Sequence, residues 1–262
     1  MMIRNLAAEL HIPREVIERL EPVPEAKPYL KGLCSESYEA AATAVHEAIG
    51  EDENGYRILS AMLEAALLAR EEYARRGIPD DIYISTMGCF PRFIGEHKES
   101  FGTYGFDHWW WTGRQTSLRL FRIGPLEYEL IREGVDNLIS VHIPSDADLS
   151  DGAVDNSLLT ARAFIHKFFP AYGEAEFICH SWLLSPALGE LLPADSRINR
   201  FRRRFEVISV DEDADDYKLW VYKDKRLSIE EFPERTTLQR KMKAYLSAGG
   251  KVGSARGIIR EK

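Results

Sequence analysis

Apolar residues recur at helical spacing through the first third of the chain. Two alanine-rich segments cover residues 37–49 and 55–76, and the second carries an apolar stripe from Ile58 to Leu67. Apolar side chains three and four positions apart predict amphipathic helices. Shorter helices are expected over residues 1–20, 80–84 and 91–100. Residues 1–84 are therefore predicted to form a helical N-terminal domain.

Alternation replaces the helical spacing after residue 117. Residues 118–123 and 126–131 place apolar side chains at every second position, and Gly124 and Pro125 separate the two segments. This pattern predicts a β-hairpin. One face of the second strand is expected to meet the core and the other to lie opposite it: Leu126, Tyr128 and Leu130 against Glu127 and Glu129.

A strand, a helix and another strand follow the hairpin, at residues 138–143, 152–169 and 176–181. A crossover of this length joins parallel neighbours. A closing hairpin is expected to pair residues 205–210 with residues 217–222, before a helix near residues 236–246 and a mobile, glycine-rich tail.

Residues 85–262 are therefore predicted to form an α/β domain with a mixed sheet. The N-terminal helices are expected to pack on this domain and roof its ligand cleft, because their apolar stripe must be covered.

Composition narrows the class of protein. The chain has 262 residues, of which 45% are hydrophobic and 29% charged, as expected for a folded globular protein. The net charge of −8 argues against nucleic-acid binding, and the basic run from Arg200 to Arg204 is expected to be a solvated helix face. No apolar stretch is long enough to span a bilayer, and the first residues lack the apolar core of a signal peptide. We expect a cytoplasmic protein that does not bind membranes.

One histidine stands where ligands gather in open α/β sheets. His142 lies near the carboxyl end of the first parallel strand, and alternation puts it on one face with Ser140. It is a candidate general base, or a histidine that is hydrogen-bonded for structural reasons. Glu127 and Glu129 on the neighbouring strand are alternative bases.

The three cysteines, Cys34, Cys89 and Cys179, are too few and too far apart for a disulfide framework or a zinc site. A Cys179–His142 pair across the two parallel strands is geometrically possible and could be nucleophilic. The alternative is a buried cysteine that packs as a small hydrophobe. A metal site of His142, His180 and Asp146 is rejected because no HxH or HxxxH spacing supports it, so no metal is expected.

Five strings carry a resemblance to a known family. They are WWT at residues 110–112, LFRIGPLEYEL at 120–130, VHIP at 141–144, CHSWLLSP at 179–186 and LLP at 191–193. Together they resemble the acyltransferase family that has an N-acyltransferase N-terminal domain and a GNAT-like C-terminal domain. The helical region before them resembles the companion domain of the same family.

The resemblance implies a binding site for acyl-CoA or acetyl-CoA. In GNAT enzymes two parallel strands splay apart and admit the pantetheine arm, and the next helix offers N–H groups to the pyrophosphate. The contacts here would come from Ile143, Ser145, Leu149 and Ser150. The loop departs from the family's glycine-rich pattern by carrying acids that disfavour a phosphate, or that simply cap the helix: Asp146, Asp148 and Asp151.

The leading interpretation is an acyl-CoA-dependent N-acyltransferase that acts on an amine of a small molecule or peptide. The catalytic candidates are His142, Cys179 and Glu129. Trp110, Trp111 and Ser181 would contact the substrate, although the tryptophans could equally pack in a core.

Two alternatives remain. One is a non-catalytic ligand-binding or regulatory module on a degenerate GNAT scaffold, favoured by the acidic loop and by the lack of the tyrosine acid of many GNAT enzymes in the helix after residue 185. The other is a thiol hydrolase or transferase that uses Cys179 and His142. The acceptor, the acyl chain length and the oligomeric state stay open.

Overall fold

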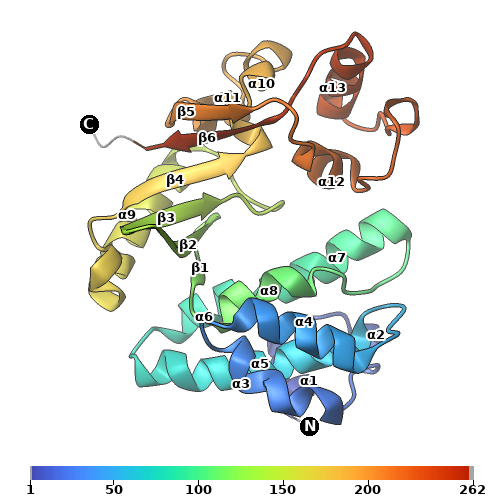
Figure 1. Cartoon of the computed structure of the whole chain (residues 1–262), viewed down its shortest axis with the longest axis vertical. Helices are drawn as coiled ribbons and strands as arrows, with labels where there is room; N and C mark the ends of the chain where they lie inside the picture. Colours follow the sequence, from blue (N-terminus) through green and yellow to red (C-terminus); the bar gives the residue numbers. More distant parts are fainter. Residues whose placement is uncertain (1, 260–262) are drawn as a thin grey trace. The chain divides into compact units, whose positions relative to one another are not determined.

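The computed structural model describes residues 2–259. These residues form two compact units, one ending at Arg122 and the other beginning at Ile123 (Figure 1). The first unit is helical and the second is built on a mixed sheet flanked by helices. The predicted α/β fold class is confirmed.

The helical unit is organised around its longest helix, α5 (Tyr56–Arg75). The predicted domain boundary after residue 84 falls inside another of its helices, α6. The unit extends to Arg122 because α6 and α8 both pack on α5, as do α1, α3 and α4. The bounds of the other helical segments are α1 (Met2–Glu9), α2 (Arg14–Ile17), η1 (Pro24–Tyr29), α3 (Leu30–Leu33), α4 (Tyr38–Ile49), α6 (Asp80–Met87), α7 (Cys89–Phe101) and α8 (Trp109–Thr116).

A glycine and a carboxylate fix the start of α5. Gly55 has a φ of 68°, and a Cβ there would lie 1.9 Å from the carbonyl oxygen of Phe106. Only glycine fits this left-handed position so close to another backbone. Asp52 Oδ2 accepts a hydrogen bond of 2.9 Å from the N–H of Ile58, which satisfies one of the unpaired donors of the first turn.

The second unit carries a six-stranded sheet in the order β1-β2-β3-β4-β6-β5. Strands β3 and β4 are parallel, as predicted, and β2 pairs antiparallel with β3. The strands are β1 (Leu120–Ile123), β2 (Leu126–Glu133), β3 (Asp136–His142), β4 (Glu176–Ser181), β5 (Glu206–Asp211) and β6 (Ser254–Ile258). The helical segments are α9 (Asp151–Phe168), η2 (Pro170–Tyr172), η3 (Trp182–Leu184), α10 (Pro186–Leu191), α11 (Arg197–Arg202), α12 (Asp216–Tyr222), η4 (Ile229–Glu231) and α13 (Thr237–Ser247).

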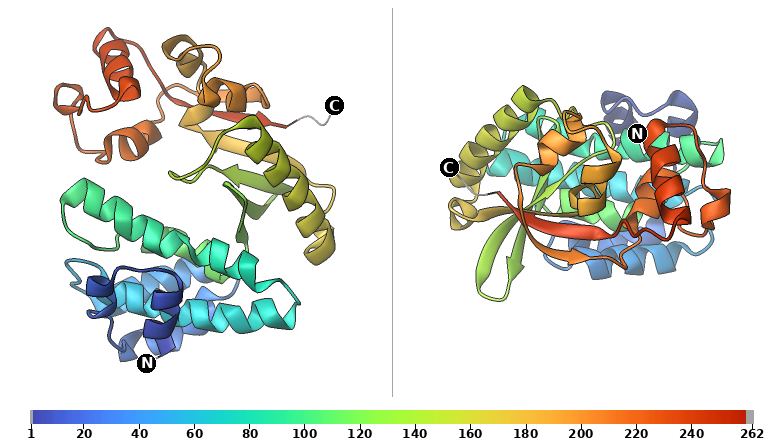
Figure 2. Two further views of the ribbon diagram at one scale, coloured as in Figure 1. Left: turned by 180° about the vertical axis from the view of Figure 1, so that it is seen from behind. Right: turned by 90° about the horizontal axis from the view of Figure 1, so that it is seen from above.

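Helix α9 covers one face of this sheet, as the left view of Figure 2 shows. The hydroxyls of Tyr128 on β2 and Ser157 on α9 lie 2.7 Å apart, and the guanidinium of Arg162 lies 4.2 Å from the centre of the Phe177 ring on β4. Tyr128 is buried as predicted. The covered face is therefore the one that carries Tyr128 and Phe177.

The glycine-rich tail contains a strand of the sheet. Residues 254–258 form β6, which pairs antiparallel with both β4 and β5. A Cβ added at Gly257 would lie 2.9 Å from the Cβ of Phe205, and one at Gly253, where φ is 62°, would lie 2.3 Å from the Asp211 carbonyl oxygen. The glycines of this part of the tail serve close backbone approach, so the expectation of a mobile tail is wrong for residues 251–259.

The predicted closing hairpin is half correct, because residues 206–211 form β5 but residues 217–222 belong to helix α12. Tyr217 and Val221 are both buried and stand four positions apart, which is the spacing of one helix face. Strand alternation and helical spacing coincide in this short apolar run. The strand that pairs with β5 is therefore β6.

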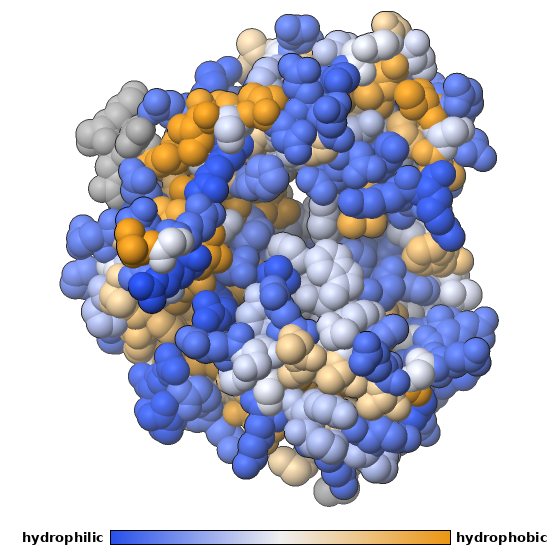
Figure 3. Space-filling model, in the orientation of Figure 1, coloured by the Kyte–Doolittle hydropathy of each residue, from blue (hydrophilic) through white to orange (hydrophobic). Residues whose placement is uncertain are grey.

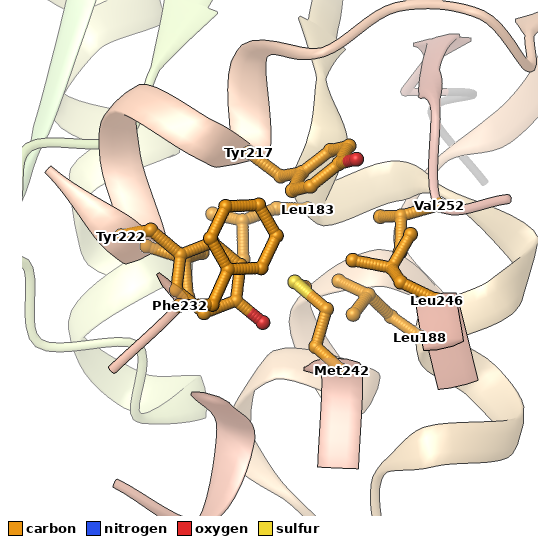
Figure 4. Packing of buried hydrophobic residues seen from close by; sticks show 9 residues of the cluster. Leu183, Leu188, Tyr217, Tyr222, Phe232, Met242, Leu246 and Val252 are labelled. Carbon is orange, nitrogen blue, oxygen red and sulfur yellow. The ribbon is translucent and has the colours of Figure 1, made fainter. Parts of the chain in front are cut away.

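The segment between β5 and β6 forms a hydrophobic core together with Leu183 of η3 and Leu188 of α10 (Figure 4). Phe232 is 1% exposed and its ring stacks on Tyr222 at a centroid separation of 3.8 Å. Ile143, which follows β3, and Trp182, which follows β4, pack against this cluster. The segment therefore stands at the carboxyl ends of β3 and β4. The buried members are Leu183, Leu188, Tyr217, Val221, Tyr222, Phe232, Met242, Leu246 and Val252.

Candidate functional site

Strands β3 and β4 separate at their carboxyl ends. Their ladder ends, within residues 2–259, at the pair of Ser140 with Ile178. Beyond this pair β3 continues against β2 as far as His142, and β4 continues against β6 as far as Ser181. Each strand is thus held from its outer side, while beyond Ser140 and Ile178 no ladder pair joins the inner edges, which leaves a gap in the strand pairing at the position predicted for the ligand.

His142 and Glu129 form a hydrogen-bonded pair beside this gap. The imidazole Nε2 lies 2.8 Å from Glu129 Oε2, and the two side chains are 23% and 10% exposed. Glu127 stands directly opposite His142 in the β2–β3 register and is 2% exposed. The three side chains share the sheet face opposite α9. A carboxylate that hydrogen-bonds one ring nitrogen in this way orients the imidazole.

Both glutamates were expected on the strand face away from the core. The alternation is right, but this second face is buried as well, since Glu127 and Glu129 are 2% and 8% exposed. Charged side chains are rarely buried without partners. Their burial beside His142 marks a polar site that alternation alone could not distinguish from a solvated strand face.

Cys179 does not join this site. In the register of β3 and β4, Ile139 is the neighbour of Phe177, so Phe177 and Cys179 lie on the α9 face while His142 lies on the other. The Cys179 side chain is fully buried, and burial raises the pKa of its thiol to about 12. The structure does not bring Cys179 and His142 together as a nucleophile and base, and Cys179 packs as a small hydrophobe.

Iodoacetamide is accordingly expected to leave Cys179 unmodified in the native protein at pH 8. A thiol with a raised pKa is almost entirely protonated there, and the thiolate is the reactive form. Peptide mass spectrometry after labelling would measure this, with the urea-unfolded chain as the control in which Cys179 reacts readily. Fast native labelling near neutral pH would contradict the assignment.

The four residues predicted to contact the cofactor have different surroundings in the loop between β3 and α9. Leu149 is buried, and Ile143 packs on the cluster of the β5–β6 segment. Ser145 is exposed. Ser150 stands at the N-cap of α9, where its N–H and its hydroxyl both donate to the Asp148 carboxylate, at 3.0 and 2.9 Å. These hydrogen bonds hold the pKa of Asp148 below its usual range.

Arginines from the α11 region offset the acids of this loop. Arg197 pairs with Asp148 at 3.3 Å. Arg200 and Arg204 both reach Asp151 in the first turn of α9, at 3.0 and 2.9 Å, and Arg204 also pairs with Asp155. The basic run was expected to be a solvated helix face. Two of its side chains instead make ion pairs, so the start of α9 is less acidic than the sequence suggests.

The three residues proposed to contact substrate have distinct surroundings. Trp110 is 42% exposed, and its ring lies 5.7 Å from that of Trp111, edge to face. The guanidinium of Arg114 lies 4.4 Å from the Trp111 ring. Both tryptophans belong to α8 in the helical unit. Ser181, at the end of β4, accepts a hydrogen bond from the N–H of Leu183 and caps η3.

Three other features of residues 2–259 bear on whether a further site exists: metal ligands, membrane-spanning helices and cavities. Within 2–259, no group of three or more His, Cys, Asp or Glu side chains is arranged to hold a metal ion. No helix in that range has the length and apolarity needed to cross a bilayer. A cavity of about 1240 Å³ lies beside α1 and α5, but its lining is mainly apolar and includes no histidine or cysteine.

Comparison with solved structures shows the same fold. A structure described as an acyltransferase in complex with decanoyl-CoA and teicoplanin has a TM-score of 0.83 and 23% identity, over 98% of this chain and 87% of that chain. A mutant of an acyltransferase in complex with octanoyl-CoA has a TM-score of 0.82 and 24% identity, over 100% and 88% of the two chains. A search of curated proteins finds no match.

Family profiles cover nearly the whole chain. The N-acyltransferase N-terminal domain matches residues 1–118, and the GNAT-like C-terminal domain matches residues 120–259. The resemblance inferred from the five sequence strings is thereby confirmed. The chain belongs to the family that joins an N-acyltransferase N-terminal domain to a GNAT-like C-terminal domain.

Proposed function

We propose that the protein transfers an acyl group from acyl-CoA to an amine of a small molecule or peptide. The observation that carries this proposal is the gap between the parallel strands β3 and β4, with the first turn of α9 following one strand and the His142–Glu129 pair beside it. Each part of the gap suits one part of such a reaction.

The inner strand edges suit the pantetheine arm. Beyond Ser140 and Ile178 the two strands pair on their outer sides, so main-chain N–H and C=O groups point into the gap. Such groups need hydrogen-bond partners. An extended chain with amides of its own, such as pantetheine, can supply them.

The first turn of α9 suits the pyrophosphate. The N–H groups of a helix start lack partners within the helix and favour anions. A Cβ added at Gly152 would meet no atom within 4 Å, so space is open beside this turn. Arg200 and Arg204 stand at the same turn through their ion pairs with Asp151, and they bring positive charge to a loop that lacks the family's glycines.

His142 suits the role of general base. Its imidazole takes a proton from the amine nitrogen while that nitrogen attacks the thioester carbonyl, and Glu129 orients the ring and stabilises the charge it gains. A C–N bond forms, the C–S bond breaks, and the electron pair leaves with the CoA sulfur, which is then protonated. Glu127 is buried opposite His142 in the strand register and lines the same face of the sheet.

The relatives suggest the range of substrates to try. Their structures hold decanoyl-CoA, octanoyl-CoA or CoA, and two include teicoplanin or 10C-teicoplanin, which are glycopeptides. Medium-chain acyl-CoAs and a bulky amine acceptor are therefore the first candidates for this chain. The proposal therefore names two classes of substrate, a medium-chain acyl-CoA as the donor and a bulky amine as the acceptor.

Calorimetric titration with acetyl-, octanoyl- and decanoyl-CoA tests the binding step. Saturable heat with one site per chain is expected. No such heat is expected when the free fatty acid is titrated in place of the acyl-CoA. Transfer is then followed by mass spectrometry of a panel of amines, including glycopeptides. No heat with any acyl-CoA at millimolar concentration would overturn the proposal.

The rival function is a ligand-binding or regulatory module without turnover. It is favoured by α10, whose sequence PALGEL contains no tyrosine to protonate the leaving thiolate. It predicts binding of acyl-CoA or another metabolite with no acylated product from any amine in the panel. Measurable transfer that depends on His142 would eliminate it.

A further inference from the structure

Strand β5 leaves an unprotected edge on the sheet. It is the last strand of the sheet order, and among residues 2–259 it pairs on one side, with β6. Every residue of β5 is exposed, and three are large apolar residues: Val207 at 41%, Ile208 at 47% and Val210 at 44%. Figure 3 shows hydrophobic side chains gathered where β5 runs in Figure 1.

This edge carries little of the protection that isolated edge strands usually have. Natural sheets protect such edges with charges in the strand, proline, or a covering loop. The middle of β5 reads Val-Ile-Ser-Val, with acidic residues at its two ends. An irregularity between Val207 and Ser209 bends the strand locally but removes no apolar side chain from solvent. An exposed apolar edge of this kind favours pairing with another strand.

We propose that β5 pairs antiparallel with β5 of a second copy of this chain, so that two sheets join across a two-fold axis. The charge pattern on either side of the strand is self-complementary. The exposed Arg203 precedes β5, and exposed acidic residues end and follow it, at positions 211–213. In an antiparallel pair the basic end of each copy meets the acidic end of the other, and two-fold symmetry makes this contact occur twice.

The charges disfavour one neighbouring register. Centring the two-fold axis on Ile208 brings the turn that carries Arg203 in each copy towards the turn that carries Asp213 in the other, and both side chains are exposed. Asp213 also pairs with Lys251 of its own copy at 2.7 Å. The same register puts Glu206 opposite Val210. Moving the axis to Ser209 would put Glu206 opposite Glu212, where like charges repel. The Ile208-centred register therefore brings the two Ile208 side chains together and avoids this repulsion.

Light scattering coupled to gel filtration tests the proposal on the full chain. The protein is expected to run as a dimer at tens of micromolar. Ile208→Lys places two like charges beside the axis and is expected to give a monomer. The matched control is Val135→Lys, which makes a comparable change at a residue that is 86% exposed in the turn between β2 and β3 and should stay dimeric.

A charge exchange tests the register independently of folding. Arg203→Glu and Asp213→Arg are each expected to raise the dimer dissociation constant about tenfold, since every substitution acts at two symmetric pairs. The double variant is expected to restore it. A monomeric wild-type chain at all concentrations, a dimer that survives Ile208→Lys, or a double variant as weak as the singles would each overturn the proposal.

Discussion

A His142→Gln variant is expected to lose acyl transfer by about 10²- to 10⁴-fold in kcat, which is the range that general acid–base catalysis contributes. Glutamine keeps a polar side chain next to Glu129 but cannot take the amine proton. Binding of acyl-CoA should stay close to that of the wild type, because the proposed anion site lies at the start of α9 and the pantetheine contacts are with main-chain groups. Stopped assays at saturating acyl-CoA would measure the loss.

Two further variants separate catalysis from general damage. Glu129→Gln removes the charge that holds the imidazole at 2.8 Å, so a smaller loss is expected than for His142 itself. His166→Gln changes an exposed histidine of α9, 70% exposed in its side chain, and should leave the rate unchanged. Equal rates for the His142→Gln and wild-type proteins would remove His142 from the mechanism.

A chain shortened to end at residue 250 is expected not to fold its α/β unit. The deletion removes β6, which pairs with both β4 and β5. It also uncovers Cys179 and Phe205, and it removes the buried residues Val252 and Ala255. A sheet that loses an interior strand loses hydrogen bonds and apolar burial on both sides of it, far more than a single substitution costs.

Soluble yield and hydrogen exchange of β3 and β4 amides would report this loss. A chain that ends at residue 259 keeps β6 and serves as the control. If the shorter chain showed the same protected amides and the same thermal transition as the full chain, the assignment of β6 to the sheet interior would be contradicted.

The parts of the fold that followed from the sequence are those with one strong period over a long segment. The helix α5, the hairpin at Gly124 and Pro125, and the β3-α9-β4 unit all formed where the pattern placed them. The run from Tyr217 to Tyr222 was mistaken for a strand because alternation and helical spacing overlap in so few residues. Strand β6 was missed because Gly, Ala and Ser dominate it and their close packing leaves no apolar pattern.

The candidate site, too, was predicted from the sequence only in part. The location of His142 followed from its place at a strand end. The Glu129 contact and the burial of Glu127 required the β2–β3 register, which alternation does not reveal. The pairing of Arg200 and Arg204 with Asp151 joins residues about fifty positions apart, so the sequence alone indicated a solvated basic helix face and acids that disfavour a phosphate or cap α9.

The position of β6 also dictates when the α/β unit can mature in the cell. Strands β4 and β5 flank β6, yet residues 212–253 separate it from β5 along the chain. A ribosome must therefore release residues 254–258 before the inner edges of β4 and β5 are covered. Until then both edges stay open to mispairing, which is the state that chaperones recognise. The helical unit is synthesised first and does not contain β6. It is therefore expected to fold early in synthesis, and the sheet late.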